Sequence, residues 1–150
     1  MKILVINGPN LNLLGTREPE IYGKTTLQDI NQELVEFSKT LSNVYSKNIE
    51  LEFFQSNFEG EIIEKIQKTK EENFDALIIN PAAYTHTSIA ISDAIKGIGI
   101  KAVEVHLSNV NSREDFRKIS YISPSAIGVV SGFQKDSYKM ALLGLCLNLN

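Results

Sequence analysis

Five short apolar runs, separated by stretches with a helical spacing of apolar residues, most constrain how this chain of 150 residues can fold. The first run, residues 2–7, is apolar almost throughout and stops at an Asn-Gly-Pro sequence. Such a run is typical of a strand buried on both faces in a parallel sheet. The second run alternates with glutamates, which indicates a strand at the sheet edge. The runs predict strands at residues 2–7, 49–54, 76–79, 102–105 and 125–130.

The intervening stretches predict five helices. Thr25 and Gln28 are spaced as a capping box for the first helix, and Ser56 and Glu59 are spaced in the same way for the second. Gly97 is expected to stop the third helix. From the apolar stripes, we expect helices to cover approximately residues 27–41, 58–66, 88–96, 113–119 and 135–147.

Strands that alternate with helices favour an α/β fold with an open parallel sheet. The predicted architecture is one flavodoxin-like, doubly wound, five-stranded sheet of order 2-1-3-4-5, in a single domain that spans residues 1–150. In such sheets, ligands bind at the carboxyl ends of the strands, near the point where the strand order reverses. Here that point lies between the first and third strands.

The connection at residues 7–26 is too long to be a passive link in a compact domain. Its second part, residues 16–24, has glycines at Gly15 and Gly23 near its two ends. We therefore expect a lid that brings Arg17 and Tyr22 over a bound ligand.

Composition excludes several classes of function. The net charge is −3 and no Lys/Arg-rich run stands out, so nucleic acid is not an expected partner. No apolar stretch reaches 18 residues and no signal peptide precedes the first strand, so we expect a cytoplasmic protein without a membrane span. The single cysteine, Cys146, lies in an apolar helical pattern and is expected to be buried.

Polar side chains that could take part in binding or catalysis follow the predicted strands. Asn80 ends the third strand, and both histidines of the chain, His86 and His106, follow adjacent strands. Glu104 and His106 share a strand face, so the carboxylate could orient the imidazole. His106 could then act as an acid or a base near neutral pH.

Each of these features also has a simpler interpretation. A histidine after a strand is often only a hydrogen-bonded surface residue. Arg113 and Arg117 share a helix face, but they could be a solvated basic face paired with Glu114 and Asp115. Taken together, arginines and backbone amides at one sheet edge suit a small polar anion. By itself, residue chemistry predicts proton transfer on such an anion.

Three other classes of function stay open at this point. A flavin- or nucleotide-binding module could use the same sheet, although the first loop lacks a Gly-x-Gly-x-x-Gly or Walker pattern. A metal hydrolase could use His86, Glu104 and His106 as ligands. A non-enzymatic assembly protein is the third.

Six motifs in a fixed order cover nearly the whole chain, and together they are far more specific than a lone glycine fingerprint. They are Asn7-Gly8-Pro9-Asn10-Leu11-Asn12-x-Leu14-Gly15, Arg17-Glu18-Pro19-x-x-Tyr22-Gly23, Asn80-Pro81-x-Ala83-Tyr84-Thr85-His86-Thr87-Ser88, Glu104-Val105-His106-Leu107-Ser108-Asn109, Arg113-x-x-Phe116-Arg117 and Ser120-Tyr121-Ile122-Ser123-Pro124. Through these motifs the chain resembles the type II 3-dehydroquinate dehydratases.

The resemblance implies a lyase that removes water from 3-dehydroquinate to give 3-dehydroshikimate, in the shikimate or quinate route. It implies an anti elimination through an enolate, with no metal, no cofactor and no Schiff base. It also implies a homo-oligomer, in which trimers assemble into a dodecamer.

The resemblance further implies roles for individual residues. Tyr22 would be the base, held as a phenolate by Arg17, because a nearby positive charge lowers the pKa of a phenol from its reference near 10. His106 would protonate the leaving hydroxyl, with its ring oriented by Glu104. Asn10 would hold a water on the developing enolate oxygen, an oxyanion-type role.

The implied substrate contacts come from the later motifs. Asn80 and the backbone amides of Leu107 and Ser108 would take the carboxylate, and His86 and Arg117 would bind ring hydroxyls. Arg113 would add positive field near the tyrosine, and Asp93 would reach the site of a neighbouring subunit. The chain departs from the family pattern at Ala82, where many members have glycine, which is freer to take a positive φ.

Overall fold

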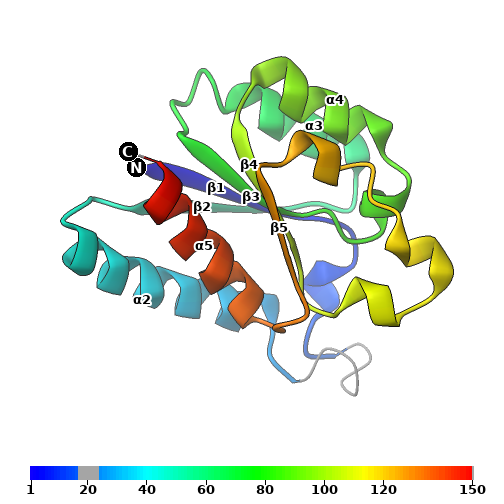
Figure 1. Cartoon of the computed structure of the whole chain (residues 1–150), viewed down its shortest axis with the longest axis horizontal. Coiled ribbons are helices and arrows are strands. Elements are labelled where there is room, and N and C mark those ends of the chain that lie inside the picture. The colour runs from blue at the N-terminus through cyan, green and yellow to red at the C-terminus, as the bar shows by residue number, and fades with distance from the viewer. Residues whose placement is uncertain (17–23, 150) are drawn as a thin grey trace.

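Five parallel strands form the central sheet in the order β2-β1-β3-β4-β5 (Figure 1). This computed structural model describes residues 1–16 and 24–149. The predicted α/β class, single-domain architecture and strand order are confirmed. The strands are β1 (Lys2–Asn7), β2 (Glu50–Gln55), β3 (Ala76–Asn80), β4 (Lys101–His106) and β5 (Gly128–Ser131).

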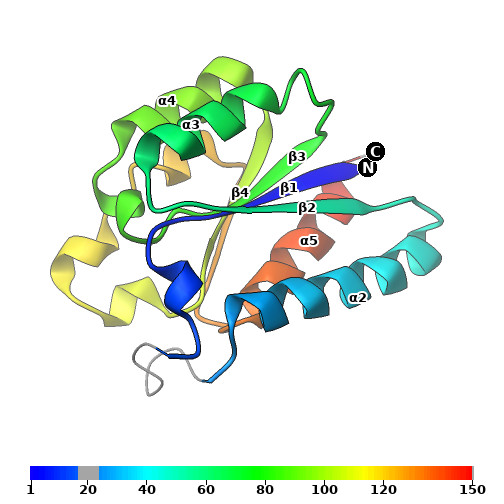
Figure 2. The same ribbon diagram turned by 180° about the vertical axis from the view of Figure 1, so that it is seen from behind.

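Helices cover both faces of this sheet. Figures 1 and 2 show α2 (Leu27–Tyr45) and α5 (Asp136–Asn148) on one face, with α3 (Glu59–Lys68) and α4 (Ile89–Ile98) on the other. Because both faces are covered, the inner strands can be apolar throughout. The arrangement is the doubly wound one that the alternating pattern predicts.

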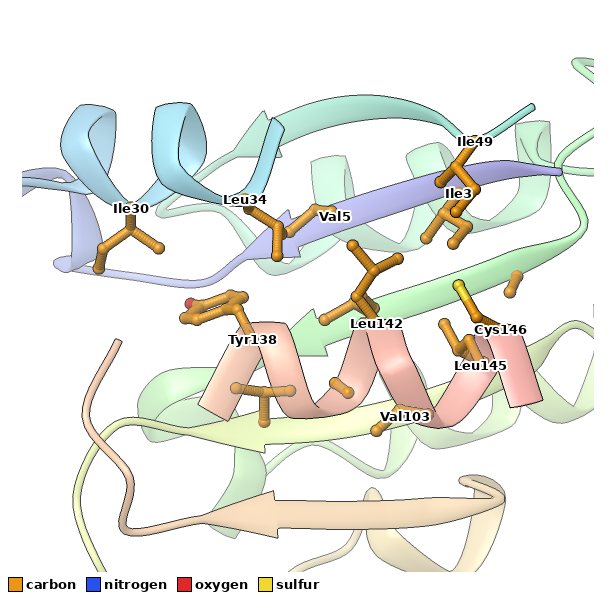
Figure 3. Close-up of a cluster of buried hydrophobic side chains, with 14 of the residues drawn as sticks. Ile3, Val5, Ile30, Leu34, Ile49, Val103, Tyr138, Leu142, Leu145 and Cys146 are labelled. Carbon is orange, nitrogen blue, oxygen red and sulfur yellow. The ribbon is translucent and has the colours of Figure 1, made fainter. Parts of the chain in front are cut away.

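The core is divided into two clusters by the sheet itself. Side chains alternate between the faces of a strand, so Ile3 and Val5 of β1 pack toward α2 and α5, whereas Leu4 and Ile6 pack toward α3 and α4. Figure 3 shows the first cluster, in which the side chains of α5 lie against β1 and β3. Cys146 belongs to this cluster and is buried, as expected.

Both predicted capping boxes are wrong in detail. The box of α2 consists of Thr26 and Asp29, one residue later than expected: the Thr26 hydroxyl accepts from the Asp29 backbone N–H, and the Asp29 carboxylate accepts from the Thr26 backbone N–H. The residue at the N-cap of α3 is Phe58, which makes no side-chain cap. Ser56 instead accepts from the Phe58 backbone N–H and pairs with Glu61.

Several predicted element bounds also shift. Helix α4 runs through Gly97 and stops at Gly99, whose φ of +73° is the left-handed conformation that ends a helix. Of the two added residues, Ile98 packs against the α3–α4 cluster. The predicted helix at 113–119 is replaced by two 3₁₀ turns, Val110–Ser112 and Asp115–Lys118.

The strand predicted at 125–130 begins later, because the turn Ser123–Ser125, which contains Pro124, precedes it. Among the described residues, the structure has no helix whose length and apolar character would let it cross a membrane.

Candidate active site

A cavity of about 240 Å³ opens where β1, β3 and β4 end. This is the edge of the sheet, beside the reversal in strand order, that the sequence predicts for a ligand. Six of the predicted site residues line it: Asn10, Asn80, Leu107, Ser108, Arg113 and Arg117.

The turns after β1 and β3 are held in close contact. Asn7 and Asn80 are register partners at the ends of these strands, and the Gly8 backbone N–H donates to the Asn80 carbonyl at 2.8 Å. A Cβ atom on Gly8 would lie 2.5 Å from the carbonyl oxygen of Pro81, so only glycine fits. The close approach brings Asn10 and Asn80 to the same cavity.

Ala82 also adopts an unusual conformation at this edge. Its φ is +52°, in the region that glycine takes readily and that costs other residues about 1–2 kcal/mol. The Asn80 side-chain oxygen accepts from the Ala82 backbone N–H at 3.2 Å and stabilises the turn. The methyl group therefore does not prevent the positive φ.

Glu104 and His106 form a buried pair at the end of β4. Their Oε1 and Nε2 atoms are 2.7 Å apart, and Glu104 has no exposed surface. The contact expected from their shared strand face is therefore present. Neither residue lines the cavity itself, but His106 directly precedes Leu107 and Ser108, which do.

Ser120 completes this arrangement, and the sequence interpretation gave it no role. Its hydroxyl lies 3.0 Å from both carboxylate oxygens of Glu104. The same oxygen accepts from the backbone N–H groups of Ile122 and Ser123, which fixes its position. Ser120 is 16 residues from Glu104 along the chain, so no local spacing signals the contact.

The two arginines share one acidic partner. Glu114 lies 2.8 Å from Arg117 Nε and 3.5 Å from Arg113 Nε, while Arg113 also reaches the Ser108 hydroxyl at 3.4 Å. Hydrogen bonds from its own backbone N–H and from Arg117 lower the pKa of Glu114. The simpler interpretation, ion pairing on a surface, is thus partly present, but both arginines also line the cavity.

Two predicted residues lie away from this cavity. His86 Nδ1 is 2.6 Å from the Ile119 carbonyl, and its ring meets Phe116 edge-on with centroids 6.3 Å apart. Because a carbonyl only accepts, Nδ1 carries the proton. Asp93 lies on α4 and lines a separate hollow beside α3. The described chain brings neither residue to the cavity wall.

Other predictions fall outside what the structure describes. Arg17, Tyr22 and most of the lid predicted at 16–24 belong to residues 17–23, so their placement stays a prediction. Within residues 1–16 and 24–149, no group of three His, Cys, Asp or Glu side chains is arranged to hold a metal ion. The alternative ligand set of His86, Glu104 and His106 is therefore not assembled.

The fold and the cavity together define an open α/β-sheet protein with a cavity, lined by polar and apolar residues, beside the reversal in strand order. The model of the family described as dehydroquinase class II matches residues 1–146. The chain belongs to this family. Membership confirms the resemblance seen in the motifs and does not support the flavin- or nucleotide-binding alternative.

Individual relatives agree with this assignment. The 3-dehydroquinate dehydratase of Geotalea daltonii is 57% identical over 145 residues, which cover 97% of this chain and 94% of the relative. That of Polynucleobacter asymbioticus is 54% identical over 140 residues, covering 93% and 90%. The crystal structure of the type II dehydroquinase from Butyrivibrio crossotus superposes with a TM-score of 0.90 at 49% identity and covers 97% of each chain.

Proposed function

We propose that this protein dehydrates 3-dehydroquinate to 3-dehydroshikimate, by an anti elimination through an enolate. The observation that carries the proposal is the buried Glu104–His106 pair, placed directly beside the residues that line the cavity. Such a pair supplies an oriented acid. The names of the relatives supply the substrate.

The reaction starts with the removal of the proton next to the ketone. Tyr22 is the proposed base, with Arg17 holding it as a phenolate. The electron pair of the broken C–H bond moves to the ketone oxygen and forms an enolate, which Asn10 stabilises through a water.

Collapse of the enolate expels the hydroxyl group. His106 donates a proton to that oxygen, and the group leaves as water. Because Nε2 is hydrogen-bonded to Glu104, Nδ1 is the nitrogen left to transfer the proton. Ser120 contacts both oxygens of the Glu104 carboxylate and holds it in place, so the imidazole keeps one orientation.

The remaining cavity residues position the substrate. Asn80 and the backbone amides of Leu107 and Ser108 bind the carboxylate, whereas Arg117 binds a ring hydroxyl, and Arg113 adds positive field near Tyr22. Two further residues outside the cavity wall also take part: His86 binds a hydroxyl, and Asp93 reaches the site of a neighbouring subunit.

The same proposal includes a dodecamer built from trimers, a cytoplasmic location and a reaction without metal or cofactor. Analytical ultracentrifugation tests the assembly, and a species of monomer mass at working concentrations would contradict it. The contribution of Asp93 across subunits depends on that assembly.

An absorbance assay for the conjugated product tests the reaction. We expect 3-dehydroshikimate to accumulate at the same rate with and without a chelator, and borohydride plus substrate to leave the enzyme active. A chelator-sensitive rate would indicate a metal, and borohydride inactivation would indicate a lysine Schiff base. No product at all would overturn the proposal.

The assignment of the base has its own test. Tyr22→Phe removes the phenol oxygen and is expected to lower kcat by orders of magnitude. Near-normal turnover in a folded Tyr22→Phe protein would show that another group removes the proton.

A further inference from the structure

Tyr138 is a buried polar residue that the mechanism above does not use. It lies in the first turn of α5 and has no exposed surface. Figure 3 shows its ring among the side chains of the α2–α5 cluster, near the arrowheads of the strands. Its hydroxyl group is therefore at the end of the sheet that carries the cavity.

The Tyr138 hydroxyl joins the last residues of the two central strands. It donates to the Asn7 side-chain oxygen at 2.6 Å and accepts from the Asn80 side-chain nitrogen at 2.9 Å. Asn7 ends β1 and Asn80 ends β3. A single phenol from the last helix thus holds both strands at the edge of the cavity.

The geometry fixes the direction of these hydrogen bonds. The Ala82 backbone N–H can only donate, so the Asn80 atom that faces it is the oxygen. The Asn80 nitrogen must then face Tyr138, whose own proton is left for Asn7. Burial raises the pKa of the Tyr138 phenol far above its usual range, so the hydroxyl keeps the proton that this arrangement requires.

The orientation matters because Asn80 lines the cavity. An amide has an acceptor side and a donor side of nearly the same shape, and only hydrogen bonding distinguishes them. Here the oxygen is used by Ala82 and one N–H by Tyr138, which leaves the second N–H of the amide to meet a ligand. A donor at this position suits an anionic oxygen.

We infer that Tyr138 is a positioning residue for the site: its hydroxyl holds the Asn80 amide with an N–H, rather than the oxygen, available to the carboxylate of the substrate. The inference rests on the proposed function for the identity of that carboxylate. The hydrogen-bond arrangement itself does not depend on the reaction.

Steady-state kinetics with 3-dehydroquinate give the first test. Tyr138→Phe keeps the ring and removes the oxygen, so we expect KM to rise about tenfold with kcat within about twofold of wild type. Tyr45→Phe is the matched control, since Tyr45 packs on the same cluster at the far end of α2 and should leave both constants unchanged. A folded Tyr138→Phe protein with wild-type KM overturns the inference.

A double-mutant cycle separates positioning from a general structural effect. If Tyr138 acts through Asn80, Tyr138→Phe should raise KM in the wild-type background but not in an Asn80→Ala background. An equal rise in KM in both backgrounds would mean that the tyrosine acts elsewhere, and it would overturn the inference.

Nuclear magnetic resonance of the wild-type protein supplies a test that needs neither turnover nor a folded Tyr138→Phe variant. The Asn80 side-chain amide protons, assigned by their loss in Asn80→Ala, should show Overhauser contacts to the Tyr138 ring protons. Absence of these contacts overturns the inference. If wild-type protein forms no 3-dehydroshikimate but the contacts are present, the proposed function fails and the positioning of Asn80 stands.

Discussion

A hollow lies at each end of the sheet, and the volumes of the two do not show which one is organised to bind a ligand. The larger hollow, about 560 Å³, lies at the amino ends of the strands, whereas the cavity at the carboxyl ends measures about 240 Å³. The residues that line the larger one include the N-terminal Met1 and three lysines, Lys47, Lys70 and Lys101.

Backbone polarity explains the difference. The α-helices of the described chain end at the amino edge, where their last carbonyls need donors. Lys47 Nζ fills this role by donating to the carbonyls of Cys146 and Leu149. Its charge stabilises the end of α5 and is already partnered.

At the carboxyl edge, several polar side chains are buried and oriented. Glu104 has no exposed surface, its partner His106 keeps only a small exposed fraction, and Tyr138 hydrogen-bonds to two asparagine amides. Oriented donors at a strand end can act on a ligand without reorganising. The comparison shows that chemical organisation, not size, distinguishes the two ends.

The largest expected effect contrasts the two ends of β4, which starts at Lys101 and ends at His106. His106→Ala should lower kcat about 10²–10⁴-fold because it removes the acid. Lys101→Ala, the matched change at the amino end, should leave kcat unchanged. Turnover assays on both variants, with melting temperatures as a folding control, measure the difference. Equal losses in kcat would remove the distinction between the ends.

A second contrast concerns glycine and backbone contact. Gly8→Ala places a methyl group against the Pro81 carbonyl, so we expect a loss of about 3 kcal/mol in the free energy of unfolding. At the amino end, the methyl group of Gly99→Ala meets open space, so only the positive φ lowers the free energy of unfolding, by about 1 kcal/mol. Urea denaturation gives both values. Equal losses would show that the β1 and β3 turns can separate freely.

The third contrast concerns residues with a positive φ. Ala82→Gly should raise the free energy of unfolding by about 1 kcal/mol, because glycine relieves the strain of the +52° conformation. Asn73, at the amino end, has a φ of +57°, which asparagine tolerates, so Asn73→Gly should change it by less than about 0.5 kcal/mol. Denaturation curves test the pair, and a destabilised Ala82→Gly protein would contradict the assignment of strain.

The smallest effects concern acid titration. At the amino end, a hydrogen bond from Lys65 lowers the pKa of Glu72. At the carboxyl end, hydrogen bonds from its own backbone N–H and from Arg117 lower the pKa of Glu114. A lowered pKa in the folded state stabilises the fold above the unfolded value near 4.5, and this contribution disappears as pH falls through the folded pKa.

Carbon NMR titration of the glutamates can measure these shifts. Lys65→Gln should return the pKa of Glu72 toward its ordinary value and leave that of Glu114 unchanged. A change at both residues would mean that the two ends are electrostatically coupled.

The sequence by itself determined the features that depend on local periodicity. The apolar runs predict all five strands, and the alternation of strand and helix spacing along the chain predicts the doubly wound class. The contact between Glu104 and His106 could be predicted from the sequence, because residues two apart share a strand face.

Only the tertiary structure decided the contacts between distant segments. Ser120 reaches Glu104 across 16 residues, and Tyr138 reaches Asn7 across 131. No spacing rule links such residues, since their meeting depends on how the sheet and helices pack. Packing also accompanies a local difference: Gly99 rather than Gly97 ends α4, and Ile98 packs, partly buried, against the core. Periodicity is a property of neighbours in the chain, whereas the support of the site comes from neighbours in space.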